Sequence, residues 1–120
     1  MGNEENKLVD LKVRTKKFSL RVIRLVQPLP NDSVTREIGK QLLRSGTSVG
    51  ANTRAIFKAR SKKEFIAKLG VVIEEADESS FWMELLVESK IVKEELLKDL
   101  MQEANELLSI FISISKKNKS

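Results

Sequence analysis

The feature that most constrains the fold is an apolar stripe that continues through a glycine-containing segment in the middle of the chain. Its members follow one another at steps of 4, 3, 4, 3 and 4 residues, which is the spacing of one face of an α-helix. They are Ile38, Leu42, Ser45, Val49, Asn52 and Ile56. A second stripe about 200° away around the helix contains Lys40, Arg44, Thr47, Ala51, Arg54 and Lys58. We therefore predict one long helix that ends near residue 59, with a buried side and a basic side.

Small residues form a third stripe beside the apolar one. It consists of Gly39, Leu43, Gly46, Gly50, Thr53 and Phe57. An interior glycine lowers helix stability by about 1 kcal/mol relative to alanine, so a loop at residues 45–52 that separates two helices is the alternative. A phosphate-binding P-loop is not favoured, because Ala51 and Asn52 follow Gly50 where that motif requires Lys and then Ser or Thr. The unbroken stripes favour a continuous helix whose glycines let another helix approach, within the subunit or across an interface.

Three further stripes predict three more helices. Their inward positions are Leu11, Thr15, Phe18, Val22 and Leu25; Phe65, Leu69, Val72, Ala76, Ser79, Met83 and Leu86; and Leu96, Leu100, Ala104, Leu107, Phe111 and Ile114. The first helix should cover residues 9–27, because Pro28 and Pro30 follow it. The third should begin with a capping box at Ser61 and Glu64 and end at residues 88–90. We predict a single all-α domain over residues 1–120, an antiparallel up-and-down four-helix bundle, with residues 1–7 and 116–120 disordered.

Charge is segregated along the chain. Residues 33–63 contain eight basic residues and one acidic residue, whereas residues 64–106 contain four basic and twelve acidic residues. A clustered basic surface can bind nucleic acid through its phosphates without reading the sequence. The residues that we expect to bind RNA or DNA in this way are Lys40, Arg44, Arg54, Lys58, Arg60, Lys62 and Lys63. The alternative is a solvated face, or one neutralised by the acidic half of a neighbouring subunit.

Polar residues near the predicted core have a structural interpretation. Glu75, Glu78 and Trp82 lie on one flank of the third helix and could contribute to a metal site or an acid/base pair. Four-helix di-metal sites also use Glu-x-x-His pairs, and the chain has no histidine; only an all-oxygen magnesium site remains open. We expect these carboxylates to pair with arginines of the second helix or of a neighbouring subunit. A buried Asn52 amide needs a hydrogen-bond partner, and Glu75 or Glu78 is the expected one.

The composition excludes several functional classes. The chain contains no cysteine and no histidine, which removes thiol catalysis, Cys/His zinc sites and Ser-His triads. We therefore expect no catalytic residue, no metal and no cofactor. No apolar run approaches the roughly 20 residues that span a membrane, so we expect a cytoplasmic protein without a membrane partner.

Three segments together resemble a known family. They are Ser-Val-Gly-Ala-Asn at residues 48–52, Ala-Arg-Ser-Lys-Lys-Glu-Phe at residues 59–65, and Glu-Ala-Asp-Glu at residues 75–78 with Trp82 after it. From about residue 8 to residue 115 the chain resembles the four-helix-bundle proteins encoded within intervening sequences of bacterial 23S ribosomal RNA genes. The related accessory protein of diversity-generating retroelements shares the resemblance. One departure is Ala55, because the family usually has an acidic residue at this position; any role of that side chain is lost or reassigned here.

The resemblance implies an up-and-down bundle that assembles as a homopentamer and has no established enzymatic activity. Its second branch adds a reverse transcriptase as a candidate protein partner. Combined with the basic cluster, it predicts a non-enzymatic, oligomeric protein that binds RNA or DNA without sequence preference. The alternative is a scaffold or adaptor whose charged faces bind only protein. An enzyme ranks third, because the chain lacks the usual combinations of nucleophile and base.

Overall fold

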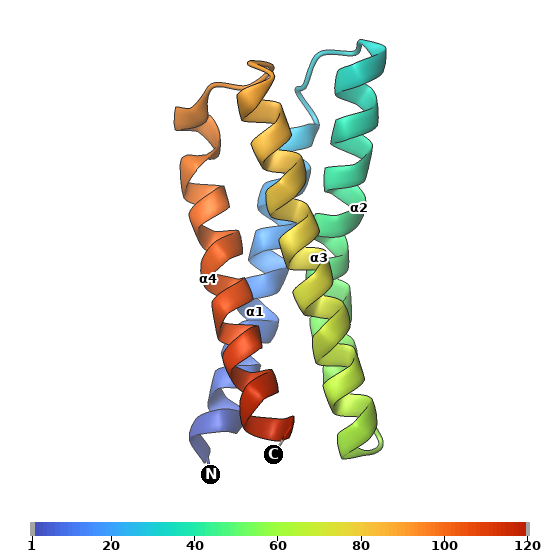
Figure 1. The fold of residues 1–120 in the computed structure, drawn as a ribbon, viewed down its shortest axis with the longest axis vertical. Helices are drawn as coiled ribbons and strands as arrows, with labels where there is room; N and C mark the ends of the chain where they lie inside the picture. Colours follow the sequence, from blue (N-terminus) through green and yellow to red (C-terminus); the bar gives the residue numbers. More distant parts are fainter. Residues whose placement is uncertain (1, 120) are drawn as a thin grey trace.

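The computed structural model describes residues 2–119, which form four helices and no strand. These are α1 (Gly2–Val26), α2 (Ser33–Ile56), α3 (Lys62–Glu88) and α4 (Glu94–Lys119). Short connections make successive helices antiparallel, and α1 packs on α2, α2 on α3, and α3 on α4 (Figure 1). The described residues measure 47 × 23 × 22 Å. The predicted all-α up-and-down bundle is confirmed.

Helix α2 runs without a break through its glycines, as the stripes predicted. It begins after Asp32, whose side chain accepts a hydrogen bond from the Thr35 amide at 2.9 Å and so satisfies a backbone donor of the first turn. The predicted end at residue 59 is wrong, because the helix stops at Ile56. The amides of residues 57–59 bond carbonyls three residues back, which tightens the chain into the turn that leads to α3.

Both outer ends are more helical than expected. Helix α1 includes residues 2–7 and α4 includes residues 116–119, where we had expected disorder; Met1 and Ser120 lie outside the described residues. No proline interrupts residues 2–27, so a helix started inside α1 can propagate toward its beginning at one backbone hydrogen bond per residue. Lys116, Lys117 and Lys119 lie in the last turn of α4, where positive charge interacts favourably with the helix dipole.

One core fills the bundle, and the predicted stripes supply most of it. Leu42, Leu69, Met83 and Phe111 come from three helices and are fully buried. The exception is the start of α4, where Leu96 is 69% exposed and Leu97 takes the core position. Positions 97, 100, 104 and 107 keep alternating steps of three and four. A start at Leu96 would need two successive steps of four, which turn about 80° away from the core-facing line.

The glycines of α2 serve a contact inside the subunit. A Cβ atom added to Gly46 would lie 2.7 Å from Cγ2 of Val22, and one added to Gly50 would lie 2.6 Å from Oγ of Ser19. Ser19 also donates a hydrogen bond from Oγ to the Gly46 carbonyl at 2.8 Å. At Gly46 and Gly50 the two helices therefore approach so closely that a larger residue would crowd α1, and these two glycines serve a contact within the subunit.

Candidate functional site

The seven basic residues expected to bind nucleic acid are all exposed, but only five of them lie close together along the chain. Lys40 lies 14 residues before Arg54 on the same helix, a separation of about 21 Å along its axis. Arg54, Lys58, Arg60, Lys62 and Lys63 lie in the last turn of α2, in the α2–α3 connection and at the start of α3. We call these five residues the basic end. Figure 1 places this connection at the same end of the bundle as the first residues of α1 and the last of α4.

Arg44 differs from the other six basic residues, because two carboxylates bind it. Its guanidinium donates to Glu75 at 3.3 Å and to Glu78 on the facing helix α3. The hydrogen bond to Glu78 is the main reason that the pKa of Arg44 is raised. Glu78 also accepts a hydrogen bond from Nε1 of Trp82 at 3.2 Å. The pairing expected between these acids and an arginine of the second helix is confirmed, and it removes the charge of Arg44 from the set available to a phosphate.

Asn52 does not reach the partner that we expected. Its side chain is partly buried and donates from Nδ2 to the Ser48 carbonyl one turn earlier at 2.9 Å. Glu75 and Glu78, the expected partners, bind Arg44 instead. The amide is satisfied within α2, so its structural role is local. Ala55, the departure from the family pattern, is partly buried in the last turn of the same helix.

The buried polar contact between α2 and α3 was missed. Oγ of Ser79 donates to Oγ of Ser45 at 3.0 Å, and both residues are fully buried. Ser45 and Ser79 lie on the inward stripes of the two helices. Because buried hydroxyl groups are almost always hydrogen-bonded, these positions were enough to predict a hydrogen bond between them. This pair, rather than Asn52, makes a buried hydrogen bond between α2 and α3.

Helix α1 adds a cation, Lys12, that is not among the seven predicted residues. Nζ of Lys12 lies 5.1 Å from the centroid of the Phe57 ring, which places it beside the basic end. Arg14, by contrast, faces α4, where it donates to Glu103 at 2.7 and 2.8 Å and to Glu106 at 2.8 Å. The spacing of Lys12 and Lys16 could have predicted this, because they are one helical turn apart and lie on a different side of α1 from Arg14.

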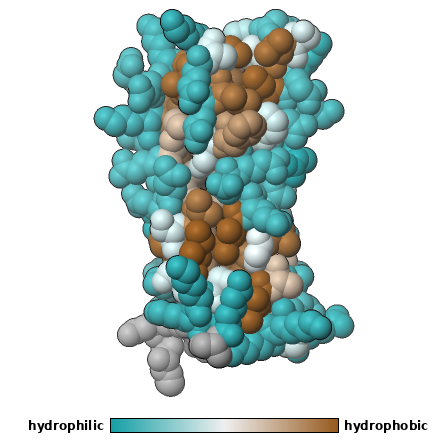
Figure 2. Space-filling view, viewed as in Figure 1, coloured by the Kyte–Doolittle hydropathy of each residue, from teal (hydrophilic) through white to brown (hydrophobic). Residues whose placement is uncertain are grey.

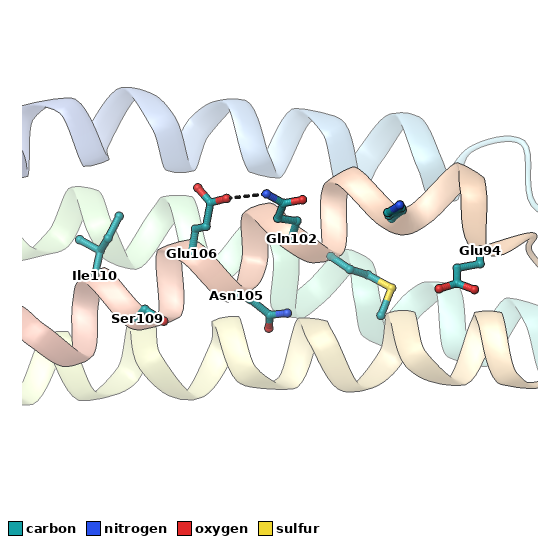
Figure 3. A pocket seen from close by; sticks show the side chains of 8 residues that line it. Glu94, Gln102, Asn105, Glu106, Ser109 and Ile110 are labelled. Carbon is teal, nitrogen blue, oxygen red and sulfur yellow. Dashed lines mark hydrogen bonds between the residues drawn. The ribbon is translucent and has the colours of Figure 1, made fainter.

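One hollow lies on the outer surface of α4. It has a volume of ≈ 760 Å³ and is lined by Glu94, Lys98, Met101, Gln102, Asn105, Glu106, Ser109 and Ile110. Figure 3 shows these side chains along one helix, with Gln102 donating to Glu106 at 3.0 Å. Acidic and basic groups alternate along it and one helix provides every wall, so it does not gather groups for chemistry. Within residues 2–119, no group of three acidic side chains could hold a metal ion, and no helix is long and apolar enough to cross a membrane.

The face formed by α3 and α4 is partly apolar. Figure 2 shows brown, hydrophobic side chains in two patches on the face where α3 lies in front, with a hydrophilic band between them. The exposed large apolar residues of these two helices are Val71, Phe81, Leu96 and Ile112. Phe81 is 49% exposed and packs edge-on against Trp82, with ring centroids 5.0 Å apart. This face therefore differs in character from the basic end.

Comparison with known proteins agrees with the fold. The family model described as 23S rRNA-intervening sequence protein matches residues 9–113. A solved crystal structure from Bacteroides thetaiotaomicron, of a protein with unknown function from the S23 ribosomal protein family, is 35% identical with a TM-score of 0.83. The match covers 88% of this chain and 98% of that one. No curated protein matches the chain.

Proposed function

The chain belongs to the 23S rRNA-intervening sequence protein family, and we propose that it is a non-enzymatic protein that binds the phosphate backbone of RNA or DNA. The observation that supports this is the basic end. Residues 45–63 contain five basic residues and no acidic residue, and the five side chains are exposed without an ion pair to any described residue. Such a cluster gains affinity by releasing the counterions of the nucleic acid.

We further propose that the protein acts as a homo-oligomer, with the pentamer as the expected state. The two apolar patches of Figure 2 support an interface between copies, because exposed apolar patches commonly mark contact sites. Helix α3 exposes Val71 and Phe81. Cyclic symmetry would repeat the basic end around an axis and multiply the phosphates that one assembly contacts. Light scattering at micromolar concentration measures this directly, and a monomer mass would remove the oligomer and the ring.

Binding should depend on salt and not on base sequence, because phosphates are common to every sequence. The test is the affinity of the protein for a duplex DNA and for a structured RNA, measured by fluorescence anisotropy between about 50 and 200 mM salt, a range over which such affinities fall steeply. The logarithm of the binding constant should fall linearly with the logarithm of the salt concentration, with a slope of about −0.9 for each duplex phosphate neutralised.

A charge-matched pair of variants locates the surface. Replacing Lys58, Arg60 and Lys62 by glutamine should flatten the slope. Replacing Lys90, Lys93 and Lys98, at the opposite end of the bundle, removes the same charge and should change the slope much less. If the wild-type protein retains neither RNA nor DNA at low salt, the scaffold function, supported by the apolar face of α3 and α4, replaces this proposal.

A further inference from the structure

A second hollow lies between α1 and α2 and is chemically uniform. It has a volume of ≈ 280 Å³ and is lined by Lys12, Lys16, Ser19, Thr47, Gly50, Ala51 and Arg54. None of these seven residues is acidic. The hollow between α1 and α4 differs, because Arg21 there faces Asp99, Glu103 and Glu106. Of the two, only the α1–α2 groove presents cations without neutralising carboxylates.

The cations of this groove are free to bind an anion. Lys12, Lys16 and Arg54 form no ion pair with any described residue, in contrast to Arg14 and Arg44. Lys12 lies over the Phe57 ring, a contact that directs the ammonium group without using up its N–H donors. Positive charge from two helices is thus presented at one opening.

The hydroxyl groups of the groove have their hydrogens committed elsewhere. Ser19 donates to the Gly46 carbonyl at 2.8 Å, and Thr47 donates to the Leu43 carbonyl at 2.7 Å. A ligand must therefore be recognised by the three cations, which are donors only. A group that accepts several hydrogen bonds and carries negative charge satisfies all three, and a phosphate is such a group.

The groove lies where α1 and α2 pack closely together. Gly50 lies there, and a Cβ atom at this position would be 2.6 Å from Oγ of Ser19 and 3.3 Å from the Thr15 carbonyl oxygen. Because two helix backbones meet at this point, the packing of the bundle sets the distance between the backbone positions that carry the cations.

We infer that the α1–α2 groove is a phosphate-binding site, in which Lys12, Lys16 and Arg54 hold the backbone of a nucleic acid. The inference rests on the proposed nucleic-acid binding and adds helix α1 to the surface that performs it. Arg54 belongs both to the basic end and to the groove, so the two are continuous. A strand that contacts the α2–α3 connection would extend its backbone along the seam between α1 and α2.

The test compares two variants that each lose three positive charges. In the groove variant, Lys12, Lys16 and Arg54 are replaced by glutamine; in the control, Lys90, Lys93 and Lys98 are replaced. Binding to duplex DNA is measured against salt for both and for the wild-type protein. In the groove variant, the salt dependence should become shallower, with the magnitude of the slope reduced by about 0.9 for each phosphate that is no longer neutralised. The control should keep the wild-type slope. Far-UV circular dichroism verifies that each variant is folded.

A second measurement uses only the wild-type protein and therefore does not depend on the folding of a variant. Amide resonances of Gly50 and Ala51 should shift when a short duplex is added, and less when inorganic phosphate is added at the same phosphate concentration. Wild-type binding with equal slopes for both variants and no shift at Gly50 would overturn the groove while leaving the proposed function intact. Shifts with inorganic phosphate alone, and none with the duplex, would assign the groove to a free phosphate compound and overturn the inference. Absence of any nucleic-acid binding by the wild-type protein would end both proposals.

Discussion

Substituting Gly46 by alanine should destabilise the bundle, although alanine is the better helix former. Intrinsic propensity favours the change by about 1 kcal/mol. The new Cβ, however, would lie 2.7, 2.8 and 3.0 Å from three atoms of Val22, which is fully buried. Valine in a helix has one strongly preferred side-chain rotamer, so it cannot turn away and α1 must move. Overpacking of this kind costs about 1–3 kcal/mol, and we place this case at the upper end, for a net loss of about 1–2 kcal/mol.

The matched control is Gly70 in α3, where an added Cβ atom would have no neighbour within 4 Å apart from the adjacent residues and the backbone of its own helix. Gly70→Ala should stabilise the protein by about 1 kcal/mol, so the same chemical change should have opposite signs at the two sites. Urea unfolding followed by far-UV circular dichroism gives the midpoints, and an unchanged dependence on denaturant shows that stability alone has changed. All variants should be compared at one protein concentration, because assembly would make stability depend on it.

A third variant examines the cause. Val22→Ala removes the side-chain atoms that crowd the new Cβ most closely, so adding Gly46→Ala to it should cost less than in the wild-type background. If Gly46→Ala instead stabilises the protein as much as Gly70→Ala does, α1 and α2 do not approach as closely as described. The explanation of the small-residue stripe would then be wrong.

Three further predictions concern the helices and their ends. Ala51→Pro should lower the free energy of unfolding by about 3 kcal/mol or more, because proline removes a hydrogen bond inside α2 and clashes with the preceding turn; native stability in this variant would contradict a continuous helix. Lys90 has φ = 64° after the end of α3, so Lys90→Gly should raise the thermal midpoint, whereas Lys93→Gly, without this backbone conformation, should not. A hydrogen bond from the Thr35 amide holds the pKa of the Asp32 carboxyl below its usual range. The ionised carboxylate therefore stabilises the fold at pH values above its unfolded-state pKa, and this stabilisation is lost as the pH falls through its folded-state pKa. Asp32→Ala should therefore lower the urea midpoint at pH 7, and this loss should shrink at acidic pH.

The sequence was sufficient for the architecture because the fold depends on periodicity. A stripe at steps of three and four specifies which side of a helix is buried, and Leu42, Val49, Leu69 and Phe111 occupy the core as this rule requires. The prediction of a continuous α2 was correct despite its glycines, because the stripes before and after them stayed in phase. The prediction that Leu96 faces the core was wrong. Leu96 and Leu97 are adjacent, and only the packing of the neighbouring helices decides which of them is buried.

The partners of polar side chains were harder to predict. The pairing of Glu75 and Glu78 with an arginine of α2 could be expected, because opposite charges faced each other on adjacent helices. The choice of Arg44 could not, since it depends on how far α2 and α3 are shifted along each other. The same relative shift brings Ser45 to Ser79 at 3.0 Å and leaves Asn52 to the carbonyl of its own helix. The positive φ of Lys90 could not be predicted from the sequence, because lysine does not favour this backbone conformation.

The glycine stripe connects the packing of the bundle to the proposed site. Gly46 and Gly50 allow the backbones of α1 and α2 to meet, and this contact brings Lys12 and Lys16 of one helix beside Arg54 of the other. A larger residue at Gly50 would push α1 outward and separate the cations as well as the core. Three like charges in one groove repel one another in the free protein, and a bound phosphate would relieve that repulsion. The close approach therefore does more than stabilise the bundle, because it places the cations of two helices where a single phosphate backbone can contact them together.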